Sequence, residues 1–131
     1  MNLRDEDIPR SQRLLLESWR VRVQQIGVHI GRHGMADEAI IPLLLGIRHP
    51  TFFTRDEGFY DRALCHRRYR RYSLVYLAVD KYEVAAFIRR VLRHRDLNSQ
   101  VKRMGTVIRA SAAGLRVWRG HATREARLDW K

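Results

Sequence analysis

The segment that most constrains the fold is LVYLAV, residues 74–79, in which all six residues are apolar or aromatic. A short run of this kind, without polar alternation, is typical of a strand that is covered on both faces. KYEVAAFIRRVLRH, residues 81–94, follows it, and its apolar side chains recur at the spacing of a helix. The two segments together predict a strand and a helix of a parallel α/β protein.

The rest of the chain alternates in the same way. The pattern predicts further strands at residues 2–5, 21–26 and 51–54, and helices from Pro9 onward and over residues 37–47. The order of elements indicates an α/β fold, specifically a three-layer α/β/α sandwich around a mostly parallel central sheet.

The C-terminal part predicts a β-hairpin and a tail. GTVIRA and GLRVWR, residues 105–110 and 114–119, have strand character and flank a short turn. We expect a single domain over residues 1–118. Residues 119–131 form a basic tail for which two alternatives stay open, partial disorder or a contact made through Trp130.

The charge balance points to a polyanionic partner. The 131 residues include 26 Lys and Arg against 14 Asp and Glu, a net charge of +12. Arginine's planar guanidinium suits phosphate, so nucleic acid is the simplest partner. A generally basic composition without any such partner is the alternative.

The same composition bears on the cellular setting. Cys65 is the only cysteine, which excludes an intrachain disulfide and suits a reducing, cytoplasmic location. The charged N-terminus does not resemble a signal peptide. The longest apolar stretch, residues 39–47, is too short to span a bilayer, so no membrane association is expected.

Acidic residues follow the predicted strands. Asp5 ends the first strand and Asp56 follows the third, while Asp37 and Glu38 begin the second helix. Because the carboxyl ends of parallel strands share one edge of a sheet, these acids are expected in one crevice. Two carboxylates about 4 Å apart repel by about 4 kcal/mol at an effective dielectric constant of about 20. Protons, arginines or a divalent cation must therefore compensate them.

Oxygen ligands of this kind suit Mg²⁺ or Mn²⁺, and a basic surround suits a phosphodiester substrate. Each acid also has a structural alternative. Asp37 could cap its helix, and Asp56 could pair with Arg55 or cap the next short helix. Asp80 also follows a strand, but DKYE has the spacing of a capping box, so Asp80 is predicted to be structural.

Basic and aromatic residues alternate in HRRYRRY, residues 66–72. Guanidinium groups there could hold phosphates, and the tyrosines could stack on unpaired bases. The alternative is a solvated loop whose tyrosines anchor it to the core. The predicted nucleic-acid-binding residues, with nearby arginines that extend the patch, are Arg10, Arg55, Arg62, Arg67, Arg68, Tyr69, Arg70 and Arg71.

Three motifs resemble the PIN-like nuclease superfamily in its short variant. They are LRDEDIPRSQRLLL, GMADEAIIPLL and TFFTRDEGFYD, which occur in the order of that family and together cover about residues 2–95. The resemblance implies a compact α/β/α sandwich that binds Mg²⁺ or Mn²⁺ through clustered acids. Members often act as ribonucleases, and many are the toxin halves of toxin–antitoxin pairs.

The resemblance also implies roles for individual residues. Asp5, Asp37 and Asp56 correspond to the catalytic, metal-binding acids, Glu38 is a neighbouring metal candidate, and Thr54 would orient a ligand. The family pattern places a second acid where this chain has Gly58, and Asp61 is the candidate substitute.

Three functions follow as hypotheses. The first is a metal-dependent endoribonuclease that acts as a toxin, with an antitoxin partner and a homodimeric state. The second is a catalytically silent RNA- or DNA-binding protein that retains the fold. The third is a protein-interaction module whose basic surface meets an acidic partner.

Overall fold

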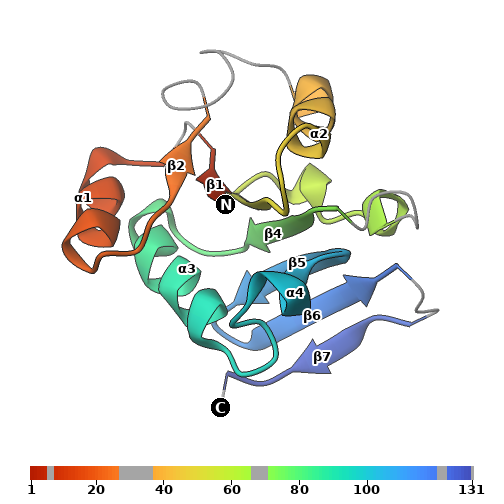
Figure 1. Ribbon diagram of the computed structural model, residues 1–131. Helices are drawn as coiled ribbons and strands as arrows, with labels where there is room; N and C mark the ends of the chain where they lie inside the picture. Colours follow the sequence, from red (N-terminus) through yellow and green to blue (C-terminus); the bar gives the residue numbers. More distant parts are fainter. Residues whose placement is uncertain (6–7, 27–36, 66–70, 121–123, 131) are drawn as a thin grey trace.

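The computed structural model describes residues 1–5, 8–26, 37–65, 71–120 and 124–130. Their core is one mixed sheet of seven strands in the order β2-β1-β3-β4-β5-β6-β7 (Figure 1). The strands up to β5 are parallel to their neighbours, while β6 and β7 are antiparallel to theirs. The strands are β1 (Asn2–Arg4), β2 (Gln24–Gln25), β3 (Thr51–Thr54), β4 (Ser73–Leu77), β5 (Thr106–Ser111), β6 (Gly114–Arg119) and β7 (Ala126–Leu128).

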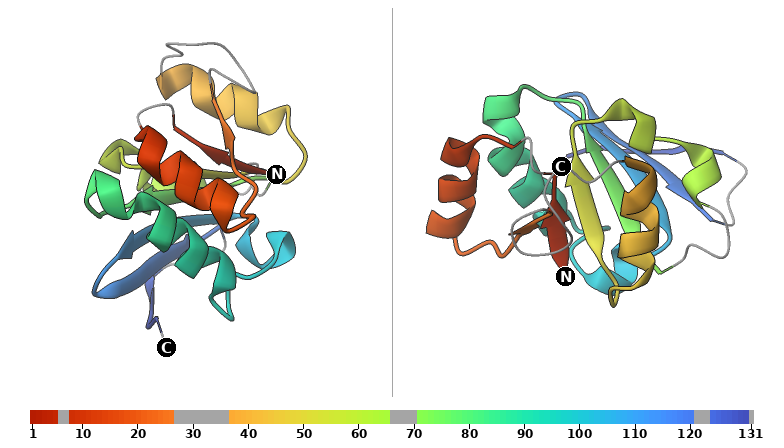
Figure 2. Two further views of the ribbon diagram at one scale, coloured as in Figure 1. Left: turned by 90° about the vertical axis from the view of Figure 1, so that its left-hand side faces the viewer. Right: turned by 90° about the horizontal axis from the view of Figure 1, so that it is seen from above.

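Helices lie on both faces of this sheet (Figure 2). α1 (Arg10–Ser18) and α3 (Val84–Arg93) pack on one face, and α2 (Asp37–Leu45) packs on the other. The remaining short helices are η1 (Glu57–Phe59), η2 (Arg62–Cys65), η4 (Lys81–Glu83) and α4 (Gln100–Arg103). The predicted α/β class and the mostly parallel sheet are thus confirmed. No helix in the described ranges is long and apolar enough to cross a membrane.

The central strand β4 shows why its sequence is almost continuously apolar. Val75 and Leu77 face a core cluster shared with α1 and α3, whereas Leu74 faces a second cluster shared with α2. Both faces of the strand are therefore covered. Tyr76 lies on the α2 face and is only half-buried.

Residues 119–131 were expected to form a basic tail, with partial disorder or a contact through Trp130 as the alternatives. Residues 126–128 form the edge strand β7, paired with β6. Trp130 then donates a hydrogen bond from Nε1 to the Ser111 carbonyl at 2.7 Å and packs edge-on against Phe87. This segment is short and polar, so its sequence carries no apolar run that would predict a strand. The pairing of β7 with β6 and the contacts of the Trp130 indole hold this segment in place.

The predicted helix over residues 81–94 also begins differently. Its first turn is the 3₁₀ helix η4, capped by Asp80, whose carboxylate accepts a hydrogen bond from the Tyr82 amide at 2.8 Å. The capping role predicted for Asp80 is confirmed. α3 itself starts at Val84, where buried Gln12 of α1 accepts a hydrogen bond from the Ala85 amide.

Candidate functional site

The chain reverses direction across the sheet between β1 and β3. β1 pairs with β2 on one side and with β3 on the other, so the connections that leave β1 and β3 run in opposite directions from this point, toward β2 and β4 respectively. In parallel α/β sheets, ligands bind in the crevice beyond the carboxyl ends of the strands at such a switch point. Asp5 and Asp56 follow the ends of these two strands.

A threonine hydroxyl joins the two acidic segments. Thr54, the last residue of β3, is fully buried and donates a hydrogen bond from Oγ1 to Asp5 Oδ2 at 3.0 Å. The same Oγ1 accepts a hydrogen bond from the Asp56 amide at 3.0 Å. The Asp5 amide continues the ladder by donating to the Phe53 carbonyl at 3.0 Å. Asp5 and Asp56 are therefore brought together through Thr54.

Asp56 also has the structural role considered as an alternative. Its Oδ1 accepts a hydrogen bond from the Gly58 amide at 2.9 Å and caps η1. Arg55 turns elsewhere and donates from Nε to the Val79 carbonyl at 3.1 Å. Within the described ranges, Asp56 Oδ2 has no hydrogen-bond partner, so one oxygen of this capping carboxylate remains available.

The turn that carries Asp56 is anchored in the core. Phe59, the last residue of η1, is buried and packs edge-on against Phe52 of β3, with ring centroids 5.4 Å apart. A carboxylate on such a turn needs little reordering to accept a ligand, which favours binding.

The other predicted metal ligands are Asp37, Glu38 and Asp61. α2 begins at Asp37 as expected, but the side chains of Asp37 and Glu38 lie outside the described part of the structure. Asp61 is exposed on the segment between η1 and η2. In the part of the chain that the structure describes, no three or more Asp, Glu, His or Cys residues form a cluster that could hold a metal ion.

The donor set of the Asp5–Asp56 pair fits Mg²⁺ or Mn²⁺. Both residues offer carboxylate oxygens, the hard ligands these ions prefer, and Mg²⁺ needs only one or two carboxylates when water and phosphate complete its shell. Asp5 and Asp56 would hold such an ion.

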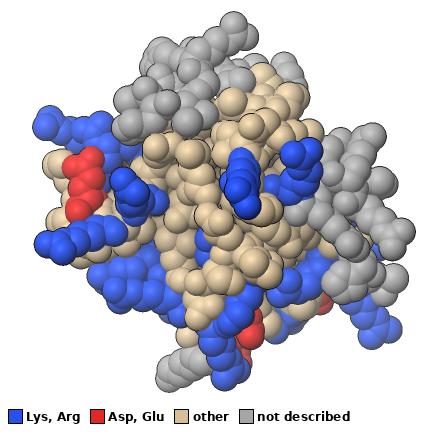
Figure 3. Space-filling view, in the orientation of Figure 1, with Lys and Arg blue, Asp and Glu red and all other residues tan. Residues whose placement is uncertain are grey.

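Basic side chains surround much of the molecule, as Figure 3 shows for one face. Four of the predicted nucleic-acid-binding residues are described, and all are exposed: Arg10, Arg55, Arg62 and Arg71. Arg62 lies over the Trp118 ring of β6, 5.1 Å from its centroid. The other four, Arg67, Arg68, Tyr69 and Arg70, lie outside the described residues. Tyr72 is buried and donates to the Leu64 carbonyl, so this tyrosine anchors its segment to the core, as the alternative for that segment proposed.

Three further arginines were not predicted from the sequence as binding residues: Arg109, Arg116 and Arg127. They line a cavity of about 280 Å³ on the antiparallel part of the sheet. The alternation of arginine with apolar residues in VIRAS and LRVWR could have identified the first two, because it predicts one polar face.

One buried charge lies directly beside the acidic site. Arg4, the residue before Asp5, is almost fully buried on the α1 face, and its three guanidinium nitrogens have no hydrogen-bond partner among the residues that the structure describes. Burial lowers the pKa of Arg4, and the positive charge of Arg13 lowers it further. The sequence pattern gave no sign of this residue's environment.

Comparison of the chain with protein-family models, with curated proteins and with solved structures gives no match. The site geometry and the sequence motifs therefore carry the functional argument.

Proposed function

We propose that this chain is a PIN-like, Mg²⁺- or Mn²⁺-dependent endoribonuclease, with a three-layer α/β/α arrangement closed by a C-terminal hairpin. The observation that carries the proposal is the pairing of Asp5 and Asp56 through the Thr54 hydroxyl at the switch point of the sheet. The three sequence motifs that resemble the PIN-like superfamily support it.

In this proposal Asp5 and Asp56 hold the cation, with Asp37 and Glu38 as further ligands at the start of α2. The bound ion would activate a water molecule and stabilise charge on the phosphodiester. Thr54 fixes the Asp5 carboxylate and the Asp56 backbone, and so positions the two ligands. Exposed arginines, including Arg55 and Arg62, would attract the RNA backbone.

The test is cleavage of a mixed RNA pool by the purified chain in Mn²⁺, Mg²⁺ or EDTA. We expect cutting with either metal, none with EDTA, and none for Asp56→Asn. Asp80→Asn is the matched control because Asp80 caps a 3₁₀ helix in the same way, and asparagine caps as well as aspartate. Loss of cutting in both variants, or cutting that persists in EDTA, would contradict the proposal.

A second candidate is a nucleic-acid-binding protein without catalysis. It is favoured by Gly58, which stands where the PIN-like pattern has a second acid. It predicts salt-sensitive binding of RNA that survives EDTA, with no cleavage by any form of the chain.

The family resemblance extends the first proposal to a biological role. The chain would be the toxin half of a toxin–antitoxin pair, with an acidic antitoxin partner and a homodimeric state. Co-elution with a purified acidic partner, and its inhibition of RNA cleavage, would test that extension.

A further inference from the structure

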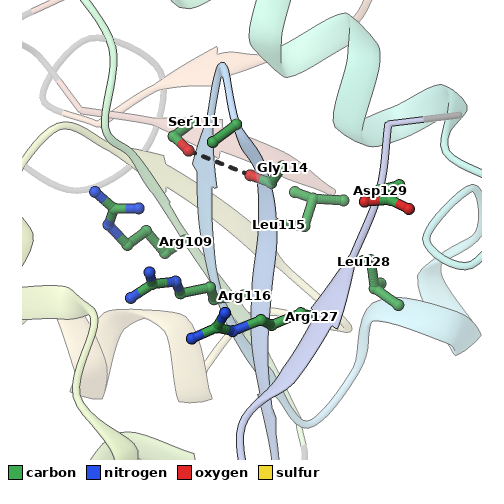
Figure 4. A pocket seen from close by; sticks show the side chains of 9 residues that line it. Arg109, Ser111, Gly114, Leu115, Arg116, Arg127, Leu128 and Asp129 are labelled. Atoms are coloured by element: carbon green, nitrogen blue, oxygen red, sulfur yellow. Dashed lines mark hydrogen bonds between the residues drawn. The ribbon is translucent and has the colours of Figure 1, made fainter.

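Three arginines lie directly opposite one another on neighbouring strands. Arg109 of β5 pairs in register with Arg116 of β6, and Arg116 pairs with Arg127 of β7. Residues opposite each other in a sheet share a face, and Figure 4 shows the three side chains leaving the strands toward the same side. We call Arg109, Arg116 and Arg127 the arginine row.

The arginine row is unfavourable for the isolated protein. Neighbouring strands are about 4.8 Å apart, and like charges on directly opposite residues destabilise a sheet. Arg116 approaches Glu125, with Nε 3.9 Å from Oε1, but Glu125 also accepts a hydrogen bond from the Tyr60 hydroxyl. Within the described ranges, the side chains of Arg109 and Arg127 form no ion pair and no hydrogen bond.

A cavity lies beside the arginine row. The cavity of about 280 Å³ is bounded by the turn between β5 and β6 and by β7. Gly114 has φ of 145°, and a Cβ there would lie 2.9 Å from the Leu128 carbonyl oxygen. Only glycine therefore allows β6 and β7 to approach this closely at this end of the cavity.

The arginine row continues in register toward the acids. Arg109 is opposite Tyr76 of β4, and Tyr76 is opposite Thr54 of β3, the residue that joins Asp5 and Asp56. The side chains in this row, those of Thr54, Tyr76, Arg109, Arg116 and Arg127, lie on the α2 face of the sheet. Two strand spacings, roughly 10 Å, thus separate the strand that carries Thr54 from the strand that carries Arg109.

We propose that the arginine row binds the phosphates of a single-stranded nucleic acid whose chain runs across the sheet toward Asp5 and Asp56. Guanidinium groups match phosphate oxygens in a bidentate geometry, and an anionic strand removes the mutual repulsion of the row. The half-buried ring of Tyr76, between the arginines and the acids, offers a surface on which an unpaired base can stack. The direction toward the acids rests on the proposed function, whereas binding by the row does not.

The test measures binding of a fluorescein-labelled single-stranded deoxyoligonucleotide by anisotropy, in EDTA so that metal-dependent cleavage plays no part. The variants are Arg109→Gln, Arg116→Gln and Arg127→Gln, singly and combined. Each arginine that contacts a phosphate should contribute roughly 0.7 to the slope of log affinity against log salt. We therefore expect the triple variant to lose roughly 2 from that slope and to bind at least about tenfold more weakly at low salt.

The control is Arg48→Gln, which removes the same charge from an exposed residue just before β3, at the opposite edge of the sheet from the acids. It should bind like the unaltered chain. Glutamine substitutions also relieve repulsion within the row, so the triple variant should unfold at the same or a higher temperature than the unaltered chain, which excludes misfolding as the cause of weak binding.

Two outcomes would overturn the proposal. Equal binding by the triple variant and Arg48→Gln would show that the row makes no phosphate contact. Competition by polyglutamate as effective as that of the oligonucleotide would assign the row to an acidic protein partner instead. Neither outcome depends on cleavage, so failure here is distinguishable from failure of the nuclease proposal.

Discussion

Two turns of this molecule look alike but differ in what they can bind. Asp56 follows β3 and Asp80 follows β4, the next strand in the sheet. Each caps a 3₁₀ helix by accepting a hydrogen bond from the amide two residues on, at 2.9 Å and 2.8 Å. By local geometry the two carboxylates have the same role.

Their surroundings are different. The Asp56 amide is bound to Thr54, whose hydroxyl reaches the second carboxylate, Asp5, across the switch point. Asp80 is exposed on the surface and leads into α3. The comparison shows that a capping aspartate becomes a candidate site only where the sheet topology brings another acid beside it.

The largest effect should be on metal affinity. We expect Asp5→Asn and Asp56→Asn to weaken Mn²⁺ binding by more than about 100-fold, because each removes a proposed ligand, whereas loss of a supporting residue typically costs 10–100-fold. Asp80→Asn should bind Mn²⁺ like the unaltered chain. Calorimetric titration measures the three affinities, and an equal loss in all three variants would remove the distinction between the turns.

Thr54→Val should have the next largest effect. Valine keeps the shape of the buried side chain but removes the hydroxyl that links Asp5 to the Asp56 amide. Mn²⁺ affinity should fall by about tenfold, and the free energy of unfolding should fall by about 1 kcal/mol because the partly buried Asp56 amide loses its partner. Unchanged metal affinity would mean that the hydroxyl supports only the fold.

Arg4→Met should stabilise the protein by about 1 kcal/mol or more, because a buried guanidinium with no hydrogen bond to any described residue is replaced by an apolar side chain of similar length. The residues in register with Arg4 on the neighbouring strands are Phe53 of β3 and Val75 of β4, and both are apolar. Urea unfolding measures the change. A loss of stability would show that the Arg4 guanidinium has a partner in solution.

Gly58→Asp should raise Mn²⁺ affinity several-fold by restoring the acid that the PIN-like pattern places there. A Cβ at this residue would lie 3.2 Å from Asp56 Oδ1, so the carboxylate must shift by a few tenths of an ångström. Gly58→Asn is the control, since it adds the same bulk without the charge. Equal affinity in both variants would argue against a metal at this turn.

The smallest effect concerns alkaline pH. Burial raises the pKa of Tyr60, the residue after η1, and its hydrogen bond to Glu125 raises it further. In the unfolded chain this tyrosine loses its proton near pH 10, while the folded state keeps it. Stability from Tyr60 is therefore fully present below about pH 10 and is lost as the pH rises further. Tyr60→Phe should abolish that part of the pH dependence in urea unfolding curves.

Much of the sheet could be predicted because its signals are local. LVYLAV and TFFT lie on strands that are buried on both faces, and the helical spacing of residues 81–94 reflects the apolar face of α3. The pairing of Asp5 with Asp56 was also expected, since parallel strands end at one edge. The family resemblance implied that Thr54 orients a ligand, but not that its hydroxyl joins the two acids.

Other features depend on contacts between distant segments. β7 and Trp130 are held by contacts with β6, Ser111 and Phe87. No sequence pattern around residue 126 predicts these contacts. The arginine row exists only in the register of β5, β6 and β7, and a shift of one residue would send each side chain to the other face. Similarly, the burial of Arg4 follows from the packing of α1 over β1.

The most direct test of the central claim is an anomalous difference map from crystals of this chain soaked in Mn²⁺. We predict a peak within about 2.2 Å of carboxylate oxygens of both Asp5 and Asp56. The same map would show whether Asp37 and Glu38 complete the site. A peak at Asp80, or no peak between Asp5 and Asp56 in well-ordered crystals, would contradict the account.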